Sequence, residues 1–167
     1  MFYEQLFVRK MIKPEPYIIR PLMEADLDAM AKIETSAHSH PWSLANLADC
    51  FGRLYHGIGL FVTQESMPET LVGFALVQQI VDEASLLDIC ISPERQGLGL
   101  GRQLMAQLIQ DAISREAVVI MLEVRESNFG AIQLYQSLGF IEVSRRKNYY
   151  QTPIGNEDAI LMDLALV

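Results

Sequence analysis

The chain has 167 residues, of which 50% are hydrophobic and 20% are charged, so it is suited to one folded domain and not to a disordered chain. Its formal net charge of −8 argues against a nucleic-acid binder, because such proteins need a basic face. No apolar run reaches the roughly 20 residues of a membrane helix, and the N-terminus lacks a secretory-signal pattern. Cys50 and Cys90 have no CxxC partner, which predicts reduced thiols and a cytoplasmic location.

The first half of the chain predicts two helices and a group of strands. A strand is expected at 17–20 and a helix at 25–37, where apolar residues recur at helical spacing. Ser43 is a good N-cap for a second helix that extends to about residue 53. Apolar runs at 58–64, 71–80 and 84–91 with short connections predict an antiparallel meander. Residues 1–15 are ambiguous, so we predict a short N-terminal extension followed by one domain over 16–167.

The second half predicts a mixed α/β arrangement. A long amphipathic helix extends to about residue 115, and the nearly continuous apolar run 117–124 predicts a parallel strand buried on both faces. A short helix at 131–138 is followed by Gly139, which fits a left-handed C-terminal cap. Strands at 141–149 and 159–166 close the chain around a loop rich in Pro, Gly and Asn.

Three glycines at alternating positions, Gly97, Gly99 and Gly101, stand between a strand and the long helix. Glycine lets backbone N–H groups approach an anion, and a helix N-terminus adds further donors. The segment therefore predicts a phosphate or pyrophosphate cradle, to which Arg95 and Arg102 add charge; a flexible loop is the plainer alternative. No Lys-Ser/Thr pair follows Gly101, which excludes a Walker loop, and the glycine spacing differs from the dinucleotide fingerprint.

The segment Gln96–Gly101 resembles the acetyl-CoA pyrophosphate loop of the GNAT acetyltransferases. Further stretches resemble the ribosomal-protein-alanine N-acetyltransferase group within that superfamily: AHSHPWS (37–43), DEASLLDICISP (82–93), LEVRESNFGAIQLYQSLGF (122–140) and NYYQTPIGNEDAILM (148–162). The resemblance implies the GNAT fold, with a mostly antiparallel sheet, a parallel strand pair at the coenzyme A site and about four helices. It also implies direct acetyl transfer, in a ternary complex, from acetyl-CoA to the N-terminal amine of a basic small-subunit ribosomal protein.

Glu123 is the candidate general base. It interrupts an apolar strand, where desolvation would make its carboxylate a better proton acceptor. The alternative from the residues alone is a strand-end glutamate paired with Arg125 or Arg102, and it is the resemblance that implies the catalytic role. Asp88 on the preceding strand is a rival base, at a position that is often uncharged in related proteins.

Tyr135 is the candidate general acid, because a phenol with a pKa of about 10 stays protonated at neutral pH. The alternative is an aromatic packing residue, and the resemblance again implies the catalytic role. Asn128 is predicted to cap the short helix and, by resemblance, to contact coenzyme A. Cys90 as a covalent nucleophile is disfavoured, because a strand cysteine is usually a core residue. The resemblance implies a donor site made of Ile89, Cys90, Ile91, Gly97, Leu98, Gly99, Leu100, Gly101, Arg102 and Asn128.

His38 and His40 form an H-x-H pair, but no cysteine or acidic cluster accompanies them in the sequence, so no metal is predicted. By resemblance, Pro41 and Trp42 border the acceptor groove, and Tyr150 within the segment 149–156 forms its other wall. Two alternatives stay open. One is a GNAT enzyme that acts on a lysine side chain or a small amine, and the other is a non-catalytic acyl-CoA-binding module.

Overall fold

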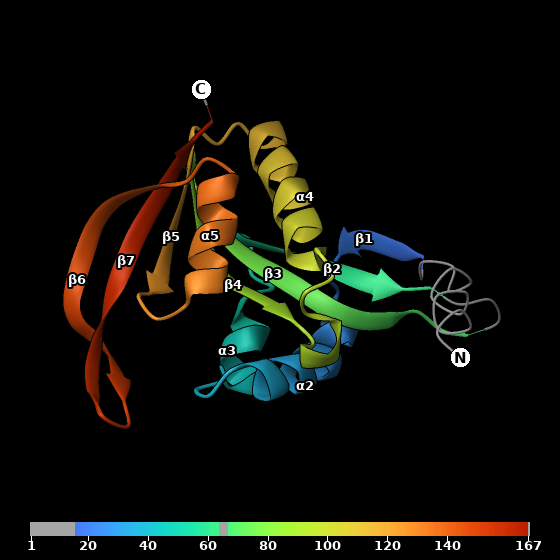
Figure 1. Cartoon of the computed structure of the whole chain (residues 1–167). Helices are drawn as coiled ribbons and strands as arrows, with labels where there is room; N and C mark the ends of the chain where they lie inside the picture. The colour runs from blue at the N-terminus through green and yellow to red at the C-terminus, as the bar shows by residue number, and fades with distance from the viewer. Residues whose placement is uncertain (1–15, 64–66, 167) are drawn as a thin grey trace, which may run out of the picture.

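The computed structural model describes residues 16–63 and 67–166, so the predicted extension 1–15 and the end of the predicted strand at residue 64 lie outside it. Within the described residues, seven strands form one sheet in the order β1-β2-β3-β4-β5-β7-β6 (Figure 1). The strands are β1 (Tyr17–Pro21), β2 (Tyr55–Val62), β3 (Thr70–Ile80), β4 (Glu83–Ile91), β5 (Val119–Arg125), β6 (Ile141–Thr152) and β7 (Gly155–Ala165). Strands β4 and β5 are parallel and the other neighbours are antiparallel, which confirms the predicted mixed sheet.

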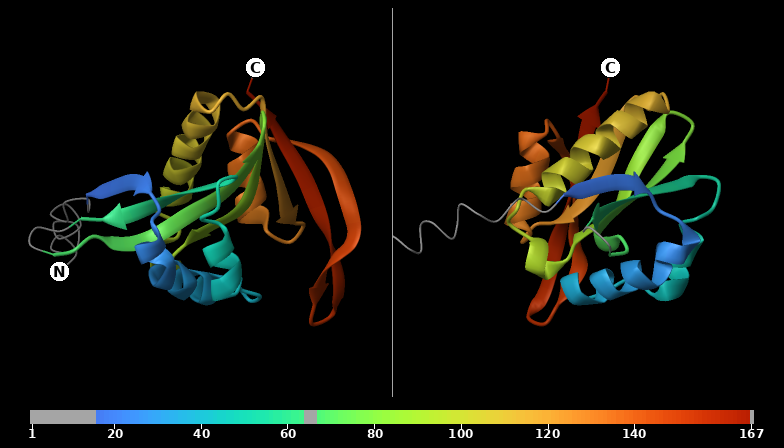
Figure 2. Two further views of the ribbon diagram at one scale, coloured as in Figure 1. Left: turned by 180° about the vertical axis from the view of Figure 1, so that it is seen from behind. Right: turned by 90° about the vertical axis from the view of Figure 1, so that its right-hand side faces the viewer.

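Helices cover both faces of the sheet, as the two views of Figure 2 show. Helices α4 (Leu100–Ser114) and α5 (Phe129–Ser137) pack on one face over the larger apolar core. Helices α2 (Leu27–Ala37) and α3 (Leu44–Asp49) pack on the other face over a second core. Among the described residues, no helix is both long and apolar enough to cross a membrane.

The capping residues predicted from the sequence cap the same helices in the structure. The Ser43 hydroxyl accepts a hydrogen bond from the Asn46 backbone N–H at 3.1 Å and caps α3, although this helix ends at Asp49, earlier than predicted. The side-chain carbonyl of Asn128 accepts from the Ala131 backbone N–H at 3.3 Å and caps α5. Gly139 follows α5 with φ of 98°, the left-handed cap that its position predicted.

Strands β4 and β5 separate part-way along their length. Their parallel pairing covers only Glu83–Leu86 against Val119–Leu122. In the pairing of β4 with β3, Val77 lies opposite Leu86 and Leu76 lies opposite Asp88, so Leu87 is an extra residue in β4. Beyond this bulge Cys90 packs in the core under α2, whereas Ile89 and Ile91 pack in the core under α4. The separation opens the sheet at its centre and leaves the edge of β4 after Leu86 unpaired with β5.

Two sequence expectations about the later strands are wrong. Burial alternates along β5, so one of its faces is more exposed than the strand buried on both faces that the sequence predicted. The last two strands form the predicted pair, but the loop between them is shorter than expected, since β6 and β7 continue to a turn at residues 153–154. Gly155 follows that turn with φ of 139°, a backbone conformation that favours glycine.

Candidate active site

A pocket of about 220 Å³ lies where β4 and β5 separate. We call it the central pocket. Its floor is formed by residues 86–89 of β4 and 122–125 of β5. Side chains from the α2 end, α5 and β6 complete it, and these are Glu34, His38, His40, Trp42, Asn128, Tyr135 and Tyr150.

A second hollow, the glycine groove, lies beside it between β4, the N-terminus of α4 and α5, with a volume of about 620 Å³. Gly97 and Gly99 line this groove with φ of 75° and 78°, and no atom lies within 4 Å of where a Cβ would stand. The first turn of α4 contributes backbone N–H groups that have no partner within a helix. The groove therefore has the exposed main chain and the positive helix end that an anionic phosphate needs.

The central pocket and the glycine groove share three lining residues, which are Ile89, Asn128 and Tyr135. A long molecule that lies in the groove therefore reaches the pocket at Tyr135. Tyr135 is only 5% exposed, and its burial, followed by the nearby charge of Asp88, raises the pKa of Tyr135 to about 12. Its phenol is thus held protonated at neutral pH, as a general acid requires.

Glu123 lies on the opposite strand and lines the central pocket. Its side chain is 33% exposed, and its Oε1 lies 3.1 Å from Nη2 of Arg146. The expected desolvation by apolar neighbours is therefore wrong, because β5 is covered on one face only. Glu123 does form an ion pair, as the alternative predicted, but its partner is Arg146 and not Arg125 or Arg102. Arg125 binds Glu157 at 2.8 Å, and Arg102 donates to the Ser137 hydroxyl.

Asp88 and Glu34 form a buried carboxyl pair at the wall of the central pocket. Their side chains are 7% and 1% exposed. Glu34 Oε1 accepts a hydrogen bond from the Trp42 backbone N–H at 2.9 Å. Apart from the proton that the two carboxyl groups share, Asp88 Oδ2 and Glu34 Oε2 have no hydrogen-bond partner among the described residues. Burial first, and then repulsion by Glu34, raises the pKa of Asp88 to about 8, so the pair holds a proton at neutral pH.

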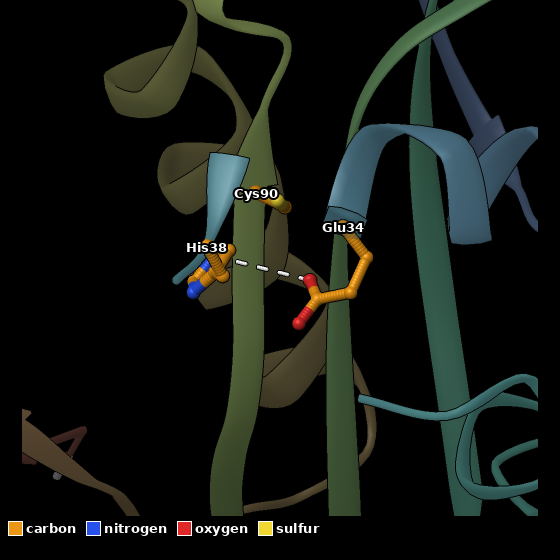
Figure 3. Close-up of side chains that lie close together, drawn as sticks. All are labelled: Glu34, His38 and Cys90. Carbon is orange, nitrogen blue, oxygen red and sulfur yellow. Dashed lines mark ion pairs between the residues drawn. The ribbon is translucent and has the colours of Figure 1, made fainter. Parts of the chain in front are cut away.

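His38 follows the end of α2, and its ring faces the Glu34 carboxylate (Figure 3). Its Nε2 is 3.8 Å from Glu34 Oε2 and 4.0 Å from Asp88 Oδ1. One possible ligand atom each of Glu34, His38 and Cys90 lies within 4.8 Å of the others. An acidic residue and a cysteine therefore do lie beside His38 in the folded protein, although they are not its neighbours in the sequence. Burial raises the pKa of the Cys90 thiol far above its usual range, which makes Cys90 a poor nucleophile.

Most of the predicted site residues gather at these two hollows. The groove is lined by Ile89, Ile91, Gly97, Gly99, Leu100, Gly101, Arg102 and Asn128. Cys90 instead packs in the core under α2, and Leu98 is 58% exposed and outside the groove lining. Trp42 and Tyr150 line the central pocket and Pro41 does not. Glu34 was not predicted as a site residue, although a charged residue one position after Ile33, on the apolar face of α2, was a signal for it.

Comparison with known proteins agrees with this geometry. Residues 27–140 match the acetyltransferase (GNAT) family. The chain belongs to this family. The GNAT chain is 41% identical over 145 residues to the ribosomal protein bS18-alanine N-acetyltransferase of Salmonella typhimurium, covering 87% of this chain and 95% of that protein. The predicted family and enzyme class, an N-acetyltransferase, are confirmed.

Solved structures of the GNAT fold superpose on this chain. The crystal structure of the ribosomal-protein-S18-alanine N-acetyltransferase from Escherichia coli aligns with a TM-score of 0.84 and 42% identity, covering 90% of this chain and 94% of that one. NAA60 of Arabidopsis thaliana in complex with acetyl-CoA aligns with a TM-score of 0.79 over 90% of this chain and 99% of that one. Its identity is 15%, so this second likeness shows the fold alone.

Proposed function

We propose that this GNAT enzyme transfers the acetyl group of acetyl-CoA to the α-amine of the N-terminal alanine of ribosomal protein bS18. The observation that carries the proposal is the 41–42% identity to bS18-alanine N-acetyltransferases, which extends over 95% and 97% of the relatives from Salmonella and Escherichia coli. That likeness covers both hollows of the site. It favours a protein N-terminus over a lysine side chain, a polyamine or a non-catalytic binding module.

The glycine groove fits acetyl-CoA. Open space at Gly97 and Gly99 lets a diphosphate approach the main chain, and Arg102 adds positive charge. The free edge of β4 at 89–91 offers backbone groups with which an extended pantetheine arm pairs like an added strand. The thioester then lies beside Tyr135, where the groove and the central pocket meet.

The reaction follows from the groups around that point. The acceptor nitrogen attacks the thioester carbon, the C–S bond breaks, and the leaving sulfur takes a proton from Tyr135. Glu123 accepts a proton from the nitrogen. Both transfers take place with donor and acceptor bound together, because the pocket and the groove adjoin and Cys90 is buried and protonated.

The central pocket takes the acceptor. Trp42 and Tyr150 form two of its walls, and its lining holds three carboxyl groups, Glu34, Asp88 and Glu123, one of which keeps a proton, against the single arginine Arg125. Together with the net charge of −8, this lining attracts the basic N-terminal segment of a ribosomal protein. The acceptor is a cytoplasmic protein, so we place the enzyme in the cytoplasm as well.

The test is acetylation of three acceptors with radiolabelled or isotope-labelled acetyl-CoA. These are a peptide with the free N-terminus of bS18, the same peptide with a blocked N-terminus and an internal lysine, and spermidine. We expect turnover on the free N-terminal alanine, with at least about 100-fold lower kcat/KM on the other two, because the two proton-transfer groups act only on a correctly placed amine. Preference for lysine or spermidine contradicts the proposal, and coenzyme A binding without turnover on any acceptor supports a binding module.

A further inference from the structure

The carboxyl pair of Glu34 and Asp88 has no task in the reaction as described above. It lies at the wall of the central pocket, its Asp88 and Glu34 side chains are 7% and 1% exposed, and apart from the proton that the two groups share, Asp88 Oδ2 and Glu34 Oε2 have no hydrogen-bond partner among the described residues. Burying two carboxyl groups against each other costs stability, because each disfavours the ionised form of the other. Glu34 accepts a hydrogen bond from the Trp42 backbone N–H, but that contact does not require the second buried carboxyl group of Asp88 beside it.

Acetylation of an α-ammonium has to dispose of two protons. An α-ammonium has three protons and the product amide keeps one, so two protons leave the nitrogen. One replaces the proton that Tyr135 gives to the sulfur, and the other is released to solvent. Glu123 stands on the β5 side of the pocket against Arg146, whereas Glu34 and Asp88 stand on the β4 side.

We propose that the Glu34–Asp88 carboxyl pair is a second proton acceptor for the reacting amine, and that His38 connects the pair to solvent. This inference rests on the proposed function, because it concerns the fate of a proton from an amine acceptor. The ammonium enters next to the pair and its positive charge favours the doubly ionised form, so Asp88 releases its proton through His38. An N–H bond of the ammonium then breaks and that proton moves to the Asp88 carboxylate. The nitrogen lone pair attacks the acyl carbon, and the second proton goes to Glu123.

His38 is placed for the exit step. Its imidazole Nε2 lies 3.8 Å and 4.0 Å from the two carboxyl groups, and a shift of about 1 Å brings it within hydrogen-bond distance of either. The His38 side chain is 40% exposed, whereas the pair is buried, so it joins the pair to solvent. An imidazole takes and gives protons at either ring nitrogen.

The other titratable groups that face the pair do not replace it. Burial raises the pKa of Tyr135, Cys50 and Cys90, so all three are neutral around pH 8. Glu123 is held on the far strand by its contact with Arg146. The groups that face Asp88 are Glu34 and His38 on α2, Cys50 after α3, Cys90 on β4 and Tyr135 on α5.

The experiment compares wild type with Asp88→Asn over a pH range of about 6.5 to 9.5, using the free N-terminal bS18 peptide. We expect kcat/KM of the variant to be about 100-fold lower at the acidic end, and the difference to shrink toward the alkaline end, where the α-amine arrives already neutral. A pH-independent ratio, or no loss at any pH, overturns the proposal. Lack of wild-type turnover on the peptide instead contradicts the proposed function, so the two failures are distinguishable.

Three controls make the result specific. Asp28→Asn is the same change on the exposed surface of α2 and should leave activity at the wild-type level. Coenzyme A affinity of Asp88→Asn, measured by titration calorimetry, should equal that of wild type and so shows a folded donor site. His38→Gln should lose activity in dilute buffer and recover it with added imidazole; a loss that imidazole does not relieve removes His38 from the path. A stoichiometric bound metal in the purified wild-type protein overturns the proton-acceptor role.

Discussion

At the residue scale, the two side chains proposed as base and acid have different environments. Tyr135 is buried against Phe140, with 5.7 Å between ring centroids, whereas Glu123 is one-third exposed and ion-paired with Arg146. The phenol is therefore held in one position by packing, and the carboxylate is held by a charge. The position of Tyr135 therefore depends on packing in the core. The position of Glu123 depends on its ion pair with Arg146, which added salt weakens.

Replacement of Glu123 by Gln should lower kcat/KM for the bS18 peptide by about 100-fold at neutral pH, because one proton acceptor is lost. The loss should diminish above about pH 8, where the α-amine is largely neutral. Steady-state kinetics across pH measure both effects. Glu83→Gln, at the exposed start of β4, is the matched control, and unchanged activity of Glu123→Gln at neutral pH would remove Glu123 as a base.

Replacement of Tyr135 by Phe keeps the ring that packs on Phe140 and removes the proton donor. We expect kcat to fall by about 100-fold with unchanged coenzyme A affinity. Because the pKa of Tyr135 is raised to about 12, wild type should show no alkaline loss of activity from this group below that range. Tyr55→Phe, which removes a hydroxyl on β2 far from the groove, is the control. A variant with full kcat contradicts the assignment.

At the element scale, local signals predicted most of the fold. Caps at Ser43 and Asn128, the apolar periods of α2 and α4, and the left-handed Gly139 are short-range features that one stretch of sequence encodes. These local signals could not predict the separation of β4 and β5, because it depends on the pairing of β4 with β3 at the Leu87 bulge. The partners of Glu123 and Asp88 were unpredictable for the same reason, since Arg146 and Glu34 are brought to them by tertiary packing.

The N-terminus of α4 gives a prediction at the same scale. Gly99 has φ of 78°, so Gly99→Val places a β-branched side chain in a conformation that it resists and puts its Cβ in the groove. We expect the dissociation constant of coenzyme A to rise at least about tenfold, by calorimetric titration, with the fold retained. Gly52→Ala is the control, because its Cβ meets neighbours at ordinary contact distance. Wild-type affinity of Gly99→Val would refute the phosphate cradle.

At the scale of the whole molecule, the buried carboxyl pair sets a pH dependence of stability. Folded Asp88 keeps its proton up to about pH 8, whereas an unfolded aspartate loses it near 3.8. The folded state therefore binds more protons in this window, and the free energy of unfolding falls as pH rises through it. Above the folded pKa, this contribution changes no further.

Asp88→Asn should remove that dependence. We expect the variant to unfold at a higher temperature than wild type at about pH 8.5, by several degrees, with a smaller difference at about pH 5. Calorimetric melting curves at the two pH values provide the measurement, with Asp28→Asn as the reference for a surface change. A wild-type protein that gains stability relative to Asp88→Asn as pH rises would contradict the shared proton.

The opening between β4 and β5 has a kinetic consequence. The glycine groove is reached from the α4 and α5 side of the sheet, and the central pocket is reached past the end of α2 on the other side. The two proposed substrates thus enter from different sides of the sheet and meet at the Tyr135 phenol. In the proposed ternary complex we therefore expect either substrate to bind first, and coenzyme A to leave while the acetylated peptide is still bound.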